Sequence, residues 1–350
     1  MNITTEVFRI DSINFEETIK KAALILKKGG LVAFPTETVY GLGADALNPE
    51  AVLKIFRAKG RPADNPLIVH IASKEQLYDL AMEVPAHATG LMDAYWPGPL
   101  TLVLKRKNVV PDITTGGLDT VAVRMPNNHI SLELIREAGT PIAAPSANVS
   151  GRPSPTDAEH VIADLAGRID AVIDDGSVKI GVESTVVDVT GDIPVILRPG
   201  GIGIEDIRKC TGDAIIGYND RMVGGEEAVR SPGMKYTHYS PQTEMVLVEG
   251  KGGEVSDKIS ELVAIGHENG MLLGLLITEE TASHVSADEM YSLGERDKPE
   301  QAARSLFMGL RWLDSRGLDM IIVDGSVKHE GIGAAVFNRL RKAADRIIEI

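Results

Sequence analysis

The chain has 350 residues, of which 43% are hydrophobic and 25% are charged, so it is long enough for two domains with a substantial core. The formal net charge of −14 argues against a protein that holds nucleic acid on a broad basic surface, although it is compatible with a compact basic pocket. A single cysteine, Cys210, excludes an internal disulfide, and no apolar run is long enough to span a membrane, so we expect a soluble, cytoplasmic protein without a membrane partner.

Strands and helices alternate over the first 205 residues and predict a mixed α/β sheet. The predicted strands are 31–34, 66–71, 100–105, 120–124, 141–144, 170–174, 184–189 and 195–198. One predicted helix has Asn48 as its N-cap, runs through 51–59 and stops at Gly60. Two more helices are predicted to begin with capping boxes, one formed by Ser73 and Gln76 and the other by Thr156 and Glu159. Another predicted helix, 131–138, ends at Gly139.

A second α/β unit is predicted after residue 241. Its strands are 244–248, 272–278 and 320–323, and its helices are 255–268, 299–314 and 334–346. Strands that alternate with helices of this length favour a small, Rossmann-like parallel sheet. We therefore divide the chain into a first domain (1–210), an extended linker (211–241) that could act as a lid, and a C-terminal domain (242–350).

Two glycine patterns do not indicate a dinucleotide site. Gly41-Leu-Gly43-Ala-Asp-Ala46 and Gly331-Ile-Gly333-Ala-Ala-Val336 match or approach G-x-G-x-x-A. That fingerprint requires a strand that runs directly into the first glycine, and the residues before Gly41 and Gly331 do not form one. The sequence also contains no P-loop motif.

Basic residues recur beside Ser, Thr, Gly or Pro at predicted turns and strand ends, namely Lys59, Arg61, Arg124, Arg152 and Arg198. Each has an ordinary structural explanation, such as a helix-dipole complement or a Ser/Pro loop. Likewise, His70 within a strand is more often a core histidine than a ligand. On a chain of this negative charge, however, the set as a whole indicates an anion site.

Five motifs in this order carry a family resemblance: P-T-E-T-V-Y-G-L-G from Pro35, K-G-R-P with N-P-L from Lys59, P-S-A-N-V-S-G from Pro145, E-S-T-V-V-D from Glu183, and R-P-G from Arg198. They closely resemble the threonylcarbamoyl-AMP synthases, over roughly residues 10–205. The linker motif Ser231-Pro-Gly-Met-Lys-Tyr-Thr-His-Tyr-Ser-Pro241 and the C-terminal domain extend the resemblance to the long, two-domain form.

This resemblance implies a twisted sheet with an open cavity, in which L-threonine, bicarbonate or CO2, and ATP give L-threonylcarbamoyladenylate and diphosphate. The intermediate serves the formation of N6-threonylcarbamoyladenosine at position 37 of tRNAs. The family's threonine contacts map onto Thr38, His70, Arg124 and Ser184. Its ATP contacts map onto Arg61, Asn65, Thr120, Ala144, Ser146, Ser154 and Arg198, and Tyr236 is our choice for the linker contact.

We expect Lys59, Arg61 and Arg124 to carry the catalysis by positive charge and positioning. We expect no metal site built by the protein alone, because Mg2+ is carried by the ATP phosphates. The proteins that transfer the threonylcarbamoyl group to tRNA are candidate partners. Two alternatives are a non-catalytic RNA-binding module with the same cavity and a carbamoyl-transfer enzyme, although the negative charge disfavours strong binding of nucleic acid.

Overall fold

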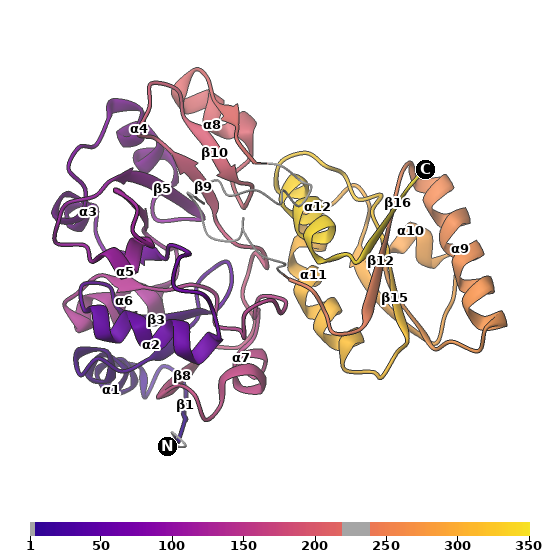
Figure 1. Cartoon of the computed structure of the whole chain (residues 1–350), viewed down its shortest axis with the longest axis horizontal. Coiled ribbons are helices and arrows are strands. Elements are labelled where there is room, and N and C mark those ends of the chain that lie inside the picture. Colours follow the sequence, from indigo (N-terminus) through magenta and orange to yellow (C-terminus); the bar gives the residue numbers. More distant parts are fainter. Residues whose placement is uncertain (1–3, 219–238) are drawn as a thin grey trace.

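The computed structural model describes residues 4–218 and 239–350, which form two α/β units side by side (Figure 1). The first unit is built on an eleven-stranded sheet with the order β1-β8-β2-β3-β7-β4-β6-β5-β9-β10-β11. Neighbouring strands are parallel in some pairs and antiparallel in others; β4 is parallel to β6, for example, and antiparallel to β7. The predicted mixed sheet is therefore confirmed.

The strands of the first unit are short and mostly buried. They are β1 (Glu6–Arg9), β2 (Val32–Phe34), β3 (Gly41–Asp45), β4 (Ile68–His70), β5 (Leu100–Lys105), β6 (Thr120–Arg124), β7 (Ile142–Ala143), β8 (Ala171–Asp174), β9 (Thr185–Asp188), β10 (Val195–Arg198) and β11 (Ile215–Ile216). The helices are α1 (Phe15–Lys27), α2 (Pro49–Lys59), α3 (Glu75–Leu80), α4 (Ala86–Tyr95), α5 (Asp112–Thr115), α6 (His129–Ala138), α7 (Ala158–Leu165) and α8 (Ile204–Thr211).

Helices cover both faces of this sheet. In β2, Val32 and Phe34 pack with α1 and α6, whereas Ala33 packs into the larger cluster that contains α2, α3, α4 and α7. Successive side chains of a strand point to opposite faces, so buried strands such as β2 are apolar throughout. The strands consequently present their ends, rather than their faces, to polar groups.

The helix ends agree with the sequence prediction at some positions and differ at others. Asn48 accepts hydrogen bonds from the N–H groups of Glu50 and Ala51, and Gly60 ends α2 in the left-handed conformation at φ 63°. Both predicted capping boxes are wrong. The N-cap of α7 is Asp157 rather than Thr156, and the Gln76 side chain accepts from Ala72 N–H instead of closing a box with Ser73.

Strand β3 and helix α1 were not predicted. The glycines that resemble a dinucleotide motif lie inside β3, antiparallel to β2. A Cβ at Gly43 would lie 2.8 Å from the Phe34 ring and 2.9 Å from Ile142, so the glycine is required by close strand packing. This placement agrees with the rejection of a dinucleotide site.

The second unit has a five-stranded sheet that is parallel throughout, with the order β14-β13-β15-β12-β16. The strands are β12 (Glu244–Glu249), β13 (Leu273–Thr278), β14 (Glu289–Gly294), β15 (Met320–Asp324) and β16 (Arg346–Glu349), and the helices are α9 (Gly252–Glu268), α10 (Glu279–Ala282), α11 (Pro299–Asp314) and α12 (Ile332–Ala343). The predicted Rossmann-like parallel sheet is confirmed.

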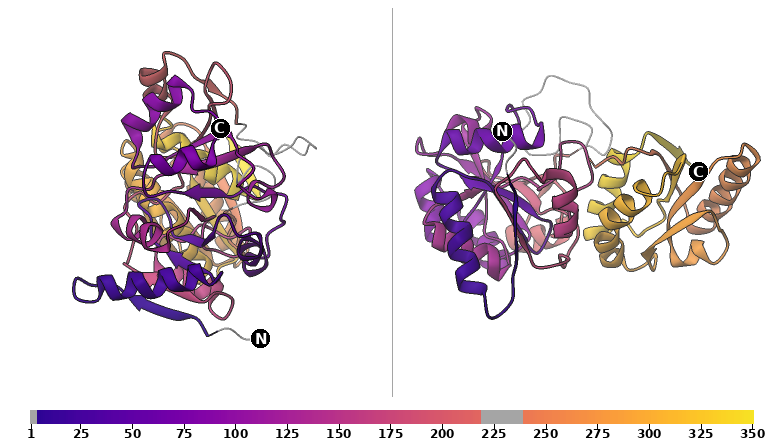
Figure 2. Two further views of the ribbon diagram at one scale, coloured as in Figure 1. Left: turned by 90° about the vertical axis from the view of Figure 1, so that its left-hand side faces the viewer. Right: turned by 90° about the horizontal axis from the view of Figure 1, so that it is seen from below.

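Alternate residues of the central strand β15 define the two faces of this second sheet. Ile321 and Val323 pack with α11 and α12, whereas Ile322 packs with α9. The α11 and α12 layer lies towards the first unit and α9 lies on the far side, as Figure 1 and the right-hand view of Figure 2 show. Helices α11 and α12 therefore supply the surface through which the second unit contacts the first.

Of the predicted linker 211–241, the structure describes residues 211–218 and 239–241. Helix α8 continues to Thr211, and β11 pairs in parallel with β10 at Val195–Ile215 and Ile196–Ile216, so the first sheet reaches into this range. Tyr236 and His238 lie outside the described residues. Across residues 4–218 and 239–350, no helix is both long enough and apolar enough to traverse a lipid bilayer.

A buried carboxylate on the first unit receives an arginine from the second. Asp164 on α7 is contacted by Arg311 of α11, at 2.8 Å from Nη2 and 3.2 Å from Nη1. The Asp164 side chain is fully buried and that of Arg311 is 11% exposed. A forked contact of this kind, shielded from solvent, fixes the two units relative to each other.

We predict that Arg311→Ala lowers the free energy of unfolding by about 2–3 kcal/mol, because it leaves the buried Asp164 carboxylate with one fewer partner. The chain has two tryptophans, Trp96 in the first unit and Trp312 in the second, so urea unfolding followed by fluorescence reports on both. Arg136→Ala, which breaks an exposed ion pair, should cost less than about 0.5 kcal/mol. Equal effects of the two substitutions would contradict the role given to Arg311.

Candidate active site

A cavity opens in the first unit, where several strands end. His70, Arg124 and Arg198 are the last residues of β4, β6 and β10, and all three line the cavity. Of the residues predicted from sequence, the cavity is lined by Thr38, Lys59, Arg61, His70, Arg124, Ala144, Ser146, Ser154, Ser184 and Arg198. The fold thus brings together residues that are up to 160 positions apart in the chain.

His70 and Arg124 form one side of the cavity. They are register partners on the parallel strands β4 and β6, and only 3% of each residue is exposed. Burial, assisted by the nearby Arg124 guanidinium, lowers the pKa of His70 to about 3. His70 is therefore a neutral imidazole at physiological pH, and Arg124 is the positive charge of this side.

The residues after β2 form a tight turn against Arg124, which we call the Thr36–Val39 turn. The Thr36 hydroxyl accepts from the N–H groups of Thr38 and Val39 and donates to the Val39 carbonyl at 2.7 Å. This turn directs Thr38 at Arg124, whose Nη1 donates to Thr38 Oγ1 at 2.9 Å. It also brings Glu37 Oε2 within 2.8 Å of Arg124 Nη2.

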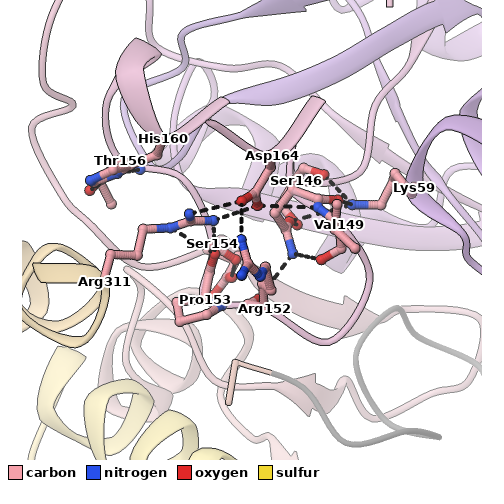
Figure 3. A network of polar contacts seen from close by, with 12 residues as sticks. Lys59, Ser146, Val149, Arg152, Pro153, Ser154, Thr156, His160, Asp164 and Arg311 are labelled. Carbon is pink, nitrogen blue, oxygen red and sulfur yellow. Dashed lines mark hydrogen bonds and ion pairs between the residues drawn. The ribbon is translucent and has the colours of Figure 1, made fainter. Parts of the chain in front are cut away.

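Lys59 and residues of the 145–156 loop also line the cavity, and Figure 3 shows the polar contacts between them. Lys59 is the last residue of α2, and its ammonium donates to the carbonyls of Ser146 and of Asn148, the latter at 2.6 Å. Burial, together with the nearby Arg61, holds the pKa of Lys59 well below its usual range. In this structure Lys59 therefore fixes the loop that carries Ser146, in addition to lining the cavity.

The 145–156 loop is also held by its own side chains. Asn148 donates from Nδ2 to the carbonyls of Val149 and Arg152, at 2.8 and 2.9 Å, and accepts from the Ser146 hydroxyl at 2.6 Å. Asp164 accepts from Arg152 at 3.0 Å and from Val149 N–H at 3.2 Å (Figure 3). The loop is thus fixed before any ligand enters.

Arg311 extends this arrangement to the second unit. It donates to the Pro153 carbonyl from Nε and Nη2, at 3.1 and 2.5 Å, as well as to Asp164 (Figure 3). Burial alone would raise the pKa of Asp164, but Arg311 and Arg152 hold it below its ordinary value. The carboxylate therefore stays ionised between the two guanidinium groups.

A second buried carboxylate, Glu183, forms part of the cavity wall. It accepts from the Ser154 hydroxyl and, at 3.0 Å, from Nε of Arg339 on α12. Burial would raise the pKa of Glu183, but the guanidinium groups of Arg339 and Arg198 hold it below its ordinary value. Arg339 is fully buried, so a residue of the second unit holds a residue of the cavity wall in place.

Ser184 and Arg198 lie next to Glu183. Arg198 donates to the Ser184 carbonyl from Nε and Nη2, at 3.1 and 2.9 Å, and to the Ser184 hydroxyl at 3.2 Å. Tyr239 also lines the cavity, with a φ of 70° that is uncommon for a residue with a side chain. Its ring lies 5.7 Å from the Arg339 guanidinium. The chain re-enters the described structure at this residue, directly in the cavity wall.

Three predicted residues are not among those that line the cavity. Asn65 is fully buried, and neither atom of its amide has a hydrogen-bond partner within residues 4–218 and 239–350. Thr120 is at the start of β6, about 13 Å along the strand from Arg124 at its end. Tyr236 lies outside the described residues.

Asn65 nevertheless lies close to the segment that leads into β6. Leu67 N–H donates to the Thr114 carbonyl at 2.9 Å, and a Cβ at Gly116 would lie 3.0 Å from the Asp64 carbonyl. Gly116 has a φ of 63°, which favours glycine. The segment around Asn65 and the segment before Thr120 thus pack together beside the cavity.

The sequence analysis did not assign Glu37, Asn148 or Glu183, although all three occur in its motifs. Thr38, Ser146 and Ser184 were assigned to the site, but the acidic or amide residue one or two positions away from each was not. All three face groups that are distant in sequence. Within the described ranges 4–218 and 239–350, no three or more His, Cys, Asp or Glu side chains gather in a group that could bind a metal ion.

Two family models match the chain. The model described as "Telomere recombination" matches residues 24–200, and the model described as "Threonylcarbamoyl-AMP synthase, C-terminal domain" matches residues 202–345. The boundary between the two matches falls between β10 and α8.

Several known proteins are similar along almost the whole chain. A threonylcarbamoyl-AMP synthase of Pyrococcus abyssi is 52% identical over 337 residues, which cover 96% of each chain. One of Bacillus subtilis is 49% identical over 329 residues, which cover 93% of this chain and 92% of the relative. The crystal structure of P. abyssi Sua5 complexed with L-threonine superposes with a TM-score of 0.90 at 50% identity and covers 100% of both chains.

The lowered pKa values of Asp164 and Glu183 predict acid sensitivity. A carboxyl whose pKa is lower in the folded than in the unfolded protein contributes stability above its ordinary pKa and loses it as the pH falls through the folded value. We expect the free energy of unfolding to decline below the ordinary values of 4.5 for Glu183 and 3.8 for Asp164. Asp164→Asn removes one contribution, so its pH dependence, measured by urea unfolding, should be shallower; an unchanged slope would contradict this assignment.

Proposed function

The chain belongs to the threonylcarbamoyl-AMP synthase family, and from this membership we propose that it forms L-threonylcarbamoyladenylate and diphosphate from L-threonine, bicarbonate or CO2, and ATP. The observation that carries the proposal is that two sets of positive side chains line one cavity. Arg124 beside a neutral His70 suits an amino acid, and Lys59, Arg61 and Arg198 suit a polyphosphate. The relatives' name favours this catalytic function over a non-catalytic RNA-binding module.

On the amino-acid wall, we assign the threonine contacts to Thr38, His70, Arg124 and Ser184. The planar guanidinium of Arg124 matches a carboxylate, which it can hold through two N–H groups. His70 is uncharged, so it neither repels the substrate ammonium nor competes with Arg124 for the carboxylate. The P. abyssi structure with bound L-threonine supports an amino-acid site in a protein of this fold.

The proposed ATP contacts share hydrogen-bonding or positively charged groups. They are Lys59, Arg61, Asn65, Thr120, Ala144 through its backbone, Ser146, Ser154, Arg198 and, from the linker, Tyr236. The unpaired, buried amide of Asn65 supports a role in binding a polar group, because leaving both amide atoms buried without a partner is costly. Ser146 and Ser154 are supported by the rigidity of the loop that carries them.

The chemistry requires two anions to meet. The neutral amine of threonine attacks CO2 to give a carbamate, and a carbamate oxygen then attacks the α-phosphate of ATP while diphosphate leaves in line. We propose that Lys59, Arg61 and Arg124 offset the negative charges and hold the reactants at this geometry. Mg2+ enters with ATP as part of the substrate, coordinated mainly by phosphate oxygens and water.

The product serves the threonylcarbamoylation of tRNA, so we propose the proteins that carry out this transfer as its recipients. The negative charge of the chain is consistent with an enzyme that acts before tRNA is bound. Helices α11 and α12 are taken up by contacts with the first unit, which leaves the α9 face of the second unit for other proteins.

The direct test is to incubate the protein with ATP, Mg2+, bicarbonate and L-threonine and to measure diphosphate release. Release should depend on threonine and on bicarbonate, and the adenylate product should be detectable by mass spectrometry. Release of phosphate from carbamoyl phosphate, with no need for ATP, would instead identify a carbamoyl-transfer enzyme. Salt-sensitive RNA binding without ATP turnover would identify the RNA-binding alternative.

We predict that Arg124→Ala raises the KM for threonine by about 100-fold, because the substrate carboxylate loses its charged partner. Arg61→Ala should raise the KM for ATP and leave the KM for threonine near its original value. Arg136→Ala, at an exposed ion pair on α6, is the matched control and should change neither constant. Diphosphate release that is intact in both site variants would overturn the site assignment.

A further inference from the structure

We propose that Glu37 is the positioning residue of the amino-acid subsite and orients the Arg124 guanidinium towards the carboxylate of the substrate. The inference rests on the proposed function, because it takes Arg124 as the threonine contact. Glu37 lies in the Thr36–Val39 turn, between the two threonines, and only 6% of it is exposed. Its carboxylate lies 2.8 Å from Arg124 Nη2.

Arg124 is held on three sides. Nε donates to the Gly98 carbonyl at 3.2 Å, Nη1 donates to Thr38 Oγ1 at 2.9 Å, and Nη2 lies beside Glu37. A guanidinium has five N–H groups, and the hydrogen bonds to Gly98 and Thr38 use two of them, which leaves one on Nη1 and both on Nη2. Two N–H groups are what a bidentate contact with a carboxylate needs.

The contact between Glu37 and Arg124 differs from a structural ion pair. Although the atoms are 2.8 Å apart, the contact is not aligned as a hydrogen bond, and neither oxygen of Glu37 has a hydrogen-bond partner in the described part of the chain. Glu249 and Arg341 of the second unit show the contrast, because both oxygens of Glu249 accept from Arg341. Arg124 Nη2 thus keeps its donor capacity while its position is fixed by charge.

Glu37 contacts Arg124 from the side that faces away from the main cavity. Glu37 is not among the residues that line the main cavity; it lines a separate hollow with residues such as Asn127 and Lys179. Thr36 lines both spaces, so the Thr36–Val39 turn forms the wall between them. Glu37 therefore acts on the substrate through Arg124, without touching it.

The burial of the ion pair between Glu37 and Arg124 costs desolvation free energy, which a role in the site would explain. The side chains of Arg124 and Glu37 are 4% and 6% exposed, and an ion pair removed from water repays its desolvation only with good hydrogen-bond geometry. The geometry here is incomplete. The carboxylate of the substrate would supply the aligned hydrogen-bond acceptor that Arg124 Nη2 lacks. This explains why the ion pair between Glu37 and Arg124 has incomplete geometry.

The test is Glu37→Gln, which keeps the shape of the side chain and removes its charge. We expect the KM for threonine to rise about 10- to 100-fold, because a guanidinium displaced by about 1 Å no longer matches the carboxylate. The KM for ATP and the kcat at saturating threonine should stay near the original values. Glu249→Gln removes an equally buried carboxylate from an arginine in the second unit and should change none of these constants.

Binding measured by calorimetry without ATP separates this proposal from the proposed function. Glu37→Gln should weaken L-threonine but not L-threoninol, which lacks the carboxylate, and Glu37→Asp should restore part of the affinity. Equal weakening of both ligands, or unchanged threonine binding, would overturn the positioning role while the wild-type protein still releases diphosphate. If both Glu37 variants fail to fold by thermal denaturation, the carboxylate serves the fold and the proposal is likewise overturned.

Discussion

The structure depends on one buried carboxylate, Asp164, which two arginines contact from different directions. Arg152 belongs to the loop that forms the cavity wall, and Arg311 belongs to the second unit. Because Asp164 is excluded from water, each of these contacts is stronger than it would be at the surface. The shape of the cavity and the relative position of the two units are therefore set at the same point (Figure 3).

Through such contacts the second unit supports the site, although it contributes little to the surface of the cavity. Arg311 binds the Pro153 carbonyl, and Arg339 binds Glu183, which in turn binds Ser154. A change at α11 or α12 thus reaches the 145–156 loop through one or two steps of hydrogen bonding. It also reaches the Thr36–Val39 turn, because Val39 packs in the same cluster as α11 and α12, and Gly181, which donates to the Thr38 carbonyl, lies against α11. Both parts of the cavity therefore depend on the second unit.

Features that depend on neighbouring residues were predicted correctly from the sequence. Features that depend on contacts with residues distant in the chain were not. The cap at Asn48 and the stops at Gly60 and Gly139 are local, and the structure has them where they were predicted. Strand β7 has only two residues, and Gly41–Asp45 becomes a strand because β2 and β7 flank it, which no local pattern shows. Thr38, His70 and Arg198 were predicted through the family motifs, and the structure places all three in the wall of one cavity. Glu183 was missed because its partner, Arg339, lies 156 residues away.

The order of the strands in the first sheet has a consequence for how the protein is made. β1 and β2, which emerge first from the ribosome, are separated in the sheet by β8, which contributes Ala171–Asp174. Likewise β5 lies between β6 and β9 in the sheet. β6 follows β5 closely in the chain, whereas β9 comes much later. The β2–β3 and β5–β6 pairs can form early, because their partners are close in the chain, but β1 lacks its neighbour until β8 has been made. Nascent chains of this protein therefore expose unpaired strand edges, to which chaperones can bind, until most of the first unit has been synthesised.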